Sequence, residues 1–124
     1  MTMPRIALVE DNADNRIVAC AILEDLYEID EYETGPDALA GLRHNPPGLV
    51  LLDISLPVMD GVEVLQQIRE DTVLGRLPVI ALTAHAMAGD RERFLRLGFD
   101  AYVTKPIVDE QLLLDEIARL LGRS

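Results

Sequence analysis

Five polar side chains of this sequence stand at the ends of apolar segments: Glu10, Asp11, Asp53, Thr83 and Lys105. Asp53 is the least ordinary of them, because an acid directly after the aliphatic run Leu49–Leu52 would be costly to place for packing alone. If the three carboxylates meet, each close pair costs roughly 4 kcal/mol at about 4 Å and an effective dielectric near 20. Such a cluster needs a raised pKa or a cation, and the ion that suits it best is Mg²⁺, with Mn²⁺ as an alternative.

The remaining residue types suit a phosphoryl group. Lys105 offers a fixed positive charge, Thr83 a hydroxyl donor, and an aspartate an oxygen nucleophile. Each has an ordinary explanation when taken singly: Glu10 or Asp11 as a helix cap, Thr83 as a strand threonine, Lys105 as a surface lysine. Their joint order along the chain argues against a purely structural explanation. The chemistry that the set indicates is phosphorylation of Asp53 itself.

The segments that carry these side chains alternate with segments of helical periodicity. The predicted strands are Arg5–Val9, a short one near Tyr27 to Tyr32, the run from Gly48 to Asp53, Pro78–Thr83 and Ala101–Thr104. The unbroken aliphatic run before Asp53 is typical of a strand covered on both faces, whereas acids interrupt the second strand, as at a sheet edge. We therefore expect an α/β three-layer sandwich with five parallel strands, whose carboxyl ends share one edge.

Five helices are expected between and after these strands. Apolar residues recur at helical spacing at Ala19, Ile22, Leu23 and Leu26, at Gly61, Val64, Leu65 and Ile68, and at Leu113, Ile117 and Leu120. Helix ends are indicated by Asn12 or Asp14, Gly35-Pro36, Asn45-Pro46-Pro47, Gly98 and Asp109. The fourth helix, about Ala88 to Leu97, is crowded with charge and offers mainly Met87, Phe94, Leu95 and Leu97 for packing. We predict that it is the most weakly held helix.

Composition limits the classes of protein that the chain can belong to. Its 124 residues suffice for one hydrophobic core, and no stretch approaches the length of a membrane span. A net charge of −11 argues against binding to nucleic acid or to an anionic membrane. No secretory signal is visible at the N-terminus, and the single cysteine, Cys20, cannot form an internal disulfide. We expect a soluble cytoplasmic protein.

Several stretches together resemble the receiver domain of two-component response regulators, over essentially all 124 residues. They are Val9–Asn12, Leu51–Asp53 with Pro57, Met59–Gly61, Val79–Ala84 and Ala101–Pro106. Asn15 and the stretch Thr83–Met87 are similar to the receivers of hybrid histidine kinases, and to their stand-alone single-domain relatives, in particular. The resemblance implies a flavodoxin-like receiver fold with strand order 2-1-3-4-5. It also implies a single receiver domain over residues 1–124, without an output domain.

The resemblance further implies roles for individual residues. Asp53 would accept a phosphoryl group from a phosphohistidine of a sensor histidine kinase or histidine phosphotransfer protein. Mg²⁺ would be bound by Asp11, Asp53 and the backbone carbonyl of Ser55, with Glu10 assisting directly or through water. The phosphoryl oxygens would be held by Thr83, Lys105 and the backbone amide of Ala84.

Signalling would follow from a conformational change, with self-catalysed phosphotransfer and autodephosphorylation as the only reactions. The resemblance makes Tyr102 the switch aromatic that moves with Thr83, and makes the Lys105-Pro106 bond cis. Ser55 and His85 sit where relatives tune the lifetime of the acyl phosphate. The face of the fourth helix, fifth strand and fifth helix would contact a downstream protein, with the chain a monomer or a phosphorylation-dependent dimer.

Three other functions compete with this interpretation. A hydrolase of the haloacid dehalogenase type wants a second acid two residues after its nucleophile, where this chain has Ser55. A flavin-binding electron carrier needs a hydroxyl- and glycine-rich loop after the first strand, where Glu10-Asp11-Asn12 would repel the phosphate. A degenerate receiver used as a scaffold would have no need of the intact acid pair, Asp53, Thr83 and Lys105.

Overall fold

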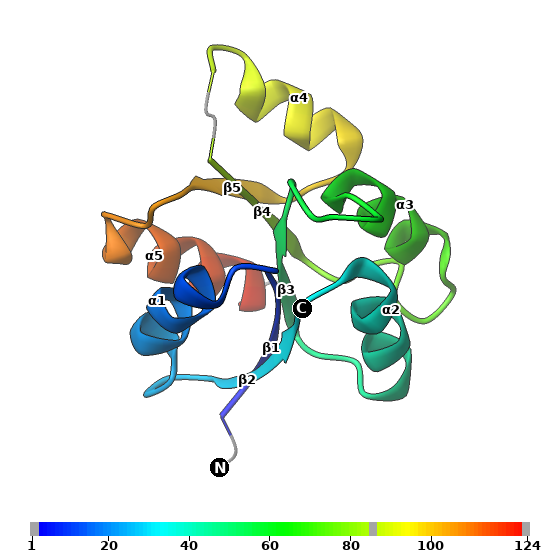
Figure 1. Ribbon diagram of the computed structural model, residues 1–124, viewed down its shortest axis with the longest axis horizontal. Coiled ribbons are helices and arrows are strands. Elements are labelled where there is room, and N and C mark those ends of the chain that lie inside the picture. Colours follow the sequence, from blue (N-terminus) through cyan, green and yellow to red (C-terminus); the bar gives the residue numbers. More distant parts are fainter. Residues whose placement is uncertain (1–2, 85–86, 123–124) are drawn as a thin grey trace.

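The structure is a computed structural model that describes residues 3–84 and 87–122. It contains a five-stranded parallel sheet in the order β2-β1-β3-β4-β5, which is the predicted order (Figure 1). The strands are β1 (Arg5–Val9), β2 (Glu28–Tyr32), β3 (Leu49–Asp53), β4 (Val79–Thr83) and β5 (Ala101–Thr104). The helices are α1 (Ala13–Leu23), α2 (Gly35–His44), α3 (Gly61–Glu70), α4 (Asp90–Leu97) and α5 (Glu110–Leu121).

Helices cover both faces of the sheet and make two hydrophobic cores. One core lies beneath α1 and α5, and the other lies beneath α2, α3 and α4 (Figure 1). Along β3 the side chains of Leu49 and Leu51 enter the first core, whereas those of Val50 and Leu52 enter the second. This alternation of a fully buried strand explains the unbroken aliphatic run, and it confirms the prediction of a strand covered on both faces.

Side-chain caps start two of the helices, α1 and α5, at the predicted places. Asn12 Oδ1 accepts a hydrogen bond from the Asn15 amide at 3.0 Å, so that Asn12, and not Asp14, caps α1. Asp60 caps α3 and Asp109 caps α5 in the same way. Since Asn12 fills this position, neither Glu10 nor Asp11 serves as a helix cap.

The predicted packing positions were wrong at two places. Leu26 lies beyond the last turn of α1 and is half exposed, because the chain leaves the helix after Leu23 to enter β2. In and before α4, Phe94 alone of the four expected residues is buried, whereas Met87, Leu95 and Leu97 are exposed. Met87 precedes α4, and consecutive residues of a helix point about 100° apart, so Phe94 and Leu95 cannot both face the sheet. A single buried large apolar side chain supports the prediction that α4 is weakly held.

The end of α4 is nevertheless fastened, by an arginine of the neighbouring helix. The Arg69 guanidinium donates to the carbonyl of Gly98 at 2.7 Å and to the carboxylate of Asp100 at 3.0 Å. It also donates to the carbonyl of Leu77 at 2.6 Å. Gly98 itself has φ 113°, which a glycine adopts without strain, and it ends α4 as predicted. At the other end of α4, Gly89 makes no side-chain cap hydrogen bond, but the Asp90 carboxylate accepts a hydrogen bond from the Met87 amide at 2.7 Å.

Strand β2 is an edge of the sheet, as its acidic residues predicted. Arg5 lies near two of these acids, at 3.1 Å from Glu28 and 3.5 Å from Asp30. Charges on an edge strand discourage pairing with another chain. Among residues 3–84 and 87–122, no helix is long and apolar enough to cross a membrane.

Val58, in the loop between β3 and α3, has a left-handed backbone. Its φ is 68°, and the Met59 amide donates to the Pro57 carbonyl at 2.7 Å to close a tight turn around it. A β-branched residue in this conformation is strained, and the side chain gains no packing because it is 94% exposed.

We therefore expect Val58→Gly to raise the free energy of unfolding, by about 1 kcal/mol after the entropic cost of glycine. Urea denaturation would measure this gain. Val73 provides the control, since it is also exposed but has no positive φ, and Val73→Gly should lose stability. Equal effects of the two substitutions would show that Val58 carries no strain.

Candidate functional site

The polar residues predicted to act together lie at one edge of the sheet. Asp53 is the last residue of β3, Thr83 is the last of β4, and Glu10 directly follows β1. The strand register pairs Val9 with Leu52 and Thr83 with Thr104, so these strand ends lie level with one another. The parallel topology therefore brings the predicted set to the same place, where sites form in open α/β sheets.

Three carboxylates meet at this edge. Glu10, Asp11 and Asp53 each offer an oxygen atom within 4.8 Å of the other two. Their burial differs: Glu10 is 1% exposed and Asp53 is 2% exposed, whereas Asp11 is open to solvent. Two buried acids side by side are stable only when positive charge or hydrogen bonds compensate them.

Lys105 supplies that compensation. Its Nζ lies 2.8 Å from Glu10 Oε1 and 3.1 Å from Asp53 Oδ1, and it is the only lysine of the chain. The Lys105-Pro106 bond is cis, as the resemblance implied. The Lys105 backbone amide also donates to the Thr83 carbonyl at 2.7 Å, which ties the residue to the end of β4.

Backbone amides complete the hydrogen bonding of the two buried acids. The Ser55 amide donates to Asp53 Oδ1 at 3.0 Å, and the Asn12 amide donates to Glu10 Oε2 at 3.1 Å. Both donors come from the residue two positions after the acid that they serve. The turn that follows each strand therefore fixes the carboxylate in front of it.

The pKa of the Glu10 carboxyl and the pKa of the Lys105 amine are both raised, for different reasons. Burial raises the pKa of the Glu10 carboxyl above its usual value, with a contribution from Asp53 and against the hydrogen bonds from Lys105 and Asn12. Burial acts to lower the pKa of Lys105, but hydrogen bonds and attraction to Glu10 and Asp53 outweigh it, and the pKa is raised. Lys105 therefore stays charged at neutral pH, whereas Glu10 takes up a proton more readily than an ordinary glutamate.

The other predicted site residues lie around this cluster. Thr83 is buried at the end of β4, and Ala84 follows it at the surface. The Ser55 amide donates to the Asp53 carboxylate. Binding of Mg²⁺ by the Ser55 carbonyl stays a prediction. Tyr102 is half-buried in β5, with its ring 5.8 Å from that of Phe94. His85 lies outside the described residues.

Arg16 is the residue of this site that sequence reasoning missed. Its guanidinium donates to the backbone carbonyls of Glu10 and Asp11, at 2.9 Å and 3.1 Å. A signal was present, because helical side chains lean toward the N-terminus of their helix. An arginine four residues after the cap Asn12 is therefore placed over the loop that carries the two acids.

Cys20 plays no part in the site. It is half-buried in α1, and burial, with the neighbouring Glu31 carboxylate, raises the pKa of its thiol to about 11. Very little thiolate forms at neutral pH, so Cys20 is a poor nucleophile.

The donor set of the acid cluster fits a hard divalent cation. All the candidate ligand atoms of the three side chains are carboxylate oxygens, and no cysteine or histidine belongs to the cluster within the described residues. Oxygen ligands of this kind suit Mg²⁺ or Mn²⁺ and do not suit a structural zinc ion. The exposure of Asp11 leaves the cluster open on one side.

Comparison with known proteins decides the family. A family model of the response regulator receiver domain matches residues 6–118. The polar-differentiation response regulator DivK of Brucella anthropi is 42% identical over 111 residues, with 85% of this chain and 87% of DivK covered. This chain belongs to the response regulator receiver domain family.

Solved receiver structures agree with this assignment. The receiver domain of a sensor histidine kinase from Pseudomonas aeruginosa PAO1 has a TM-score of 0.88 and 35% identity, with 98% of this chain and 99% of that chain covered. It was crystallised with a magnesium ion coordinated in its active-site cleft. The chemotaxis response regulator CheY4 of Vibrio cholerae, at 24% identity and a TM-score of 0.86, covers 96% of this chain and confirms the flavodoxin-like fold alone. As a receiver, the chain is a signalling domain of two-component systems.

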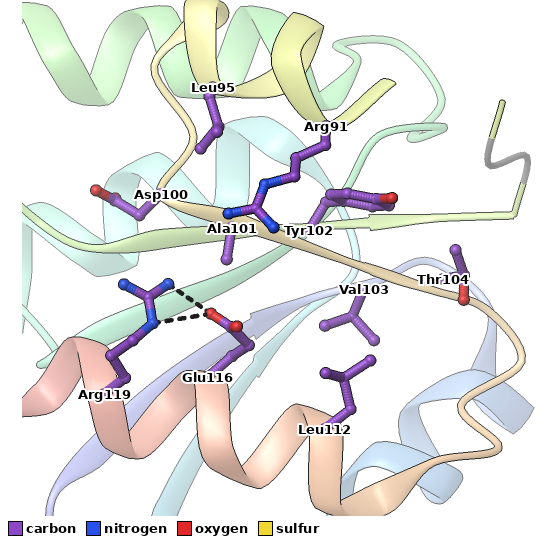
Figure 2. Close-up of a pocket in the computed structure, with 10 residues that line it drawn as sticks. All are labelled: Arg91, Leu95, Asp100, Ala101, Tyr102, Val103, Thr104, Leu112, Glu116 and Arg119. Carbon is purple, nitrogen blue, oxygen red and sulfur yellow. Dashed lines mark hydrogen bonds and ion pairs between the residues drawn. The ribbon is translucent and has the colours of Figure 1, made fainter. Parts of the chain in front are cut away.

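A groove lies on another face of this receiver, between α4, β5 and α5 (Figure 2). Its apolar lining includes Leu95, Ala101 and Leu112, and the ring of Tyr102 lies at one side of it. Arg119 and Glu116 form an ion pair on α5, while Arg91 reaches down from α4 (Figure 2). The face predicted to contact a downstream protein is therefore hollowed and partly apolar.

Proposed function

We propose that this receiver accepts a phosphoryl group on Asp53 from a phosphohistidine of a sensor histidine kinase or histidine phosphotransfer protein. The observation that carries the proposal is the placement of Lys105, whose amine contacts both Asp53 and Glu10 beside a third acid. A packing role alone gives no reason to bury two acids and the only lysine together. The arrangement suits the transfer of a negatively charged phosphoryl group to Asp53, where the Lys105 amine would stabilise the added charge.

The transfer itself requires little covalent chemistry from the receiver. A carboxylate oxygen of Asp53 attacks phosphorus in line, the phosphorus–nitrogen bond of the donor breaks, and the imidazole leaves with a proton from solvent. Lys105, the Thr83 hydroxyl and the Ala84 amide would hold the phosphoryl oxygens. Positioning and charge stabilisation account for most of the catalysis in such transfers.

Glu10, Asp11 and Asp53 would hold Mg²⁺, together with the backbone carbonyl of Ser55. A bound Mg²⁺ would neutralise charge on the phosphoryl oxygens during transfer. The ion would be a second positive partner for Glu10 and Asp53 besides Lys105, so that the amine could move from these acids to the phosphoryl group. Asp11 is the acid that most depends on the ion, because Lys105 contacts the other two.

The receiver would signal through a partner protein and would not turn over a substrate. The groove of α4, β5 and α5 supplies a surface for that partner. Tyr102 lines this groove and belongs to β5, the strand that pairs with β4, which ends at Thr83. Thr83 and Tyr102 would move together on phosphorylation, and Ser55 and His85 would tune the lifetime of the acyl phosphate. Whether the chain is a monomer or a phosphorylation-dependent dimer, and its cytoplasmic location, stay predictions.

Intact-mass spectrometry after incubation with acetyl phosphate and Mg²⁺ tests the proposal. We expect one added phosphoryl group on the wild type, none on Asp53→Asn, and very little when EDTA removes the metal. Asp14→Asn is the matched control, because Asp14 is an exposed acid of the same edge outside the cluster, and it should be modified like the wild type. Release of many equivalents of phosphate without accumulation of the adduct would favour the hydrolase instead.

The raised pKa of Glu10 predicts how Mg²⁺ binding depends on pH. Since a proton on Glu10 competes with the ion, the Kd for Mg²⁺ should rise as the pH falls, beginning at a higher pH than an ordinary glutamate would give. Isothermal titration calorimetry between pH 5 and pH 8 would measure the change. Glu10→Gln should reduce this pH dependence, and the same pH dependence in the wild type and in the variant would contradict the prediction.

A further inference from the structure

The Arg16 side chain connects the loop after β1 with the acidic residues at the end of β2. It is the fourth residue of α1, and its Nη1 donates to the carbonyls of Glu10 and Asp11 at 2.9 Å and 3.1 Å. These two carbonyls belong to the loop that leaves β1 and carries two of the three acids. The guanidinium therefore holds the main chain of the loop directly.

The other side of the same guanidinium faces the acidic edge of the sheet. Nη2 donates to Glu33 Oε1 at 3.1 Å, and Nε lies 3.5 Å from Glu31 Oε1. The Arg16 side chain is 15% exposed, whereas those of Glu31 and Glu33 are 49% and 69% exposed. A planar guanidinium with five donors can join two carbonyls to two carboxylates in this way, and an ammonium group cannot reproduce the geometry.

Asp11 is the acid whose position depends most on this contact. The carboxylates of Glu10 and Asp53 accept hydrogen bonds from backbone amides and from Lys105. The Asp11 carboxylate receives no hydrogen bond or ion pair within the part of the chain that the structure describes, although it lies within 4.8 Å of the other two acids. Its place beside them is therefore set by its main chain.

We propose that Arg16 is a positioning residue for the magnesium site, which fixes the main chain of Glu10 and Asp11 so that the Asp11 carboxylate faces Asp53. The inference rests on the proposed function, because it assigns Arg16 a part in binding the ion that the phosphoryl transfer needs. Arg16 would act through the loop and not as a ligand, because its contacts there are with the backbone carbonyls of Glu10 and Asp11. Groups that orient metal ligands typically change metal affinity by about 10-fold to 100-fold when they are lost.

If Arg16 acted only through its charge, its removal would change the Kd for Mg²⁺ in the direction opposite to that expected from a positioning role. Arg16 is a cation close to a site that binds a cation, so its removal should tighten Mg²⁺ binding if charge were its only effect. Loss of positioning should weaken the same binding. The direction of the change in Kd therefore separates the two accounts.

Titration calorimetry with MgCl₂ on the metal-free protein measures this change. We expect the Kd for Mg²⁺ to rise about 10-fold in Arg16→Ala and by less in Arg16→Lys, which keeps the charge but loses the fork. Arg5→Ala is the matched control, because Arg5 pairs with Glu28 and Asp30 of the same edge and does not contact the loop. The control should bind Mg²⁺ within about 2-fold of the wild type.

Melting curves in EDTA separate positioning from a contribution to stability. A lower melting temperature of Arg16→Ala with an unchanged or smaller Kd would overturn the inference, while phosphorylation of the wild type would leave the proposed function standing. Failure of the wild type to bind Mg²⁺ would overturn both. If Arg16→Ala does not fold, Arg16→Lys carries the test, and a Kd equal to that of the wild type would then reject the inference.

Phosphorylation by acetyl phosphate provides a second readout. A positioning role predicts that the rate for Arg16→Ala is low at the Mg²⁺ concentration that half-saturates the wild type and recovers when Mg²⁺ is saturating. A rate that stays low at saturating Mg²⁺ would place the defect in the transfer itself and reject the inference.

Discussion

Lys105→Met is expected to lower the free energy of unfolding by about 3 kcal/mol at pH 8 in EDTA, and to reduce phosphorylation strongly. The side chain of Lys105 is 13% exposed, so its removal leaves the buried carboxylates of Glu10 and Asp53 without their shared cation. Breaking a buried ion pair from one side typically costs about 3 to 5 kcal/mol. Methionine keeps the length and most of the volume of the side chain, which limits the loss to the charge.

The same substitution should have a smaller effect at low pH. The pKa of Lys105 is raised above its ordinary value, so the wild-type amine remains charged throughout the range from pH 5 to pH 8. The pKa of Glu10 is also raised, so the folded state gains stability relative to the unfolded chain as the pH falls and Glu10 takes up its proton. In Lys105→Met that protonation relieves the repulsion between the acids.

Urea denaturation at pH 5 and pH 8 measures both effects. Arg119→Met is the control, because the ion pair of Arg119 with Glu116 lies at the surface and should contribute less than about 1 kcal/mol. A Lys105→Met variant as stable as the wild type at pH 8 would mean that the amine does not compensate the two acids.

Saturating Mg²⁺ is expected to stabilise the folded receiver, and Asp11→Ala should lose most of this effect. An ion that binds only the folded state at about 100 times its Kd adds about 2.7 kcal/mol to the free energy of unfolding. Asp11 is the exposed acid of the cluster and has no contact with Lys105, so the substitution removes a ligand without breaking the buried pair. Without metal, Asp11→Ala should be as stable as the wild type or more stable, since one repelling charge is gone.

Thermal unfolding with and without MgCl₂ tests this pair of expectations. Asp14→Ala removes an exposed acid of the neighbouring α1 turn and should keep the full response to Mg²⁺. Identical melting curves of the wild type in MgCl₂ and in EDTA would count against a metal site formed by Glu10, Asp11 and Asp53.

The fold and most of the site could be predicted from the sequence because both depend on local patterns. The aliphatic run Leu49–Leu52 is typical of a strand buried on both faces, and parallel strands bring their polar ends to one edge. The meeting of Asp53 with Glu10 and Lys105 follows from topology and needs no knowledge of side-chain geometry.

The features that were missed depend on how individual side chains reach across elements. Arg16 and Arg69 both bind backbone carbonyls of other segments, and a sequence pattern says nothing about which carbonyls lie within reach. The left-handed turn at Val58 runs against residue preference, so no pattern could indicate it. The exposure of Leu95 and Leu97 depends on where α4 begins, and helix ends are hard to place when no side chain caps them.

Reductive trapping of the phosphorylated protein tests the central claim most directly. Borohydride reduces an acyl phosphate to the alcohol, so that only a phosphorylated aspartate becomes homoserine, and peptide mapping then locates the changed residue. After incubation with acetyl phosphate and Mg²⁺, we expect the conversion at Asp53 and at no other acid. Homoserine at Asp11, reduction of Glu10 to its own alcohol, which is one methylene longer than homoserine, or an added phosphoryl group that borohydride leaves unchanged would contradict Asp53 as the phosphoryl acceptor.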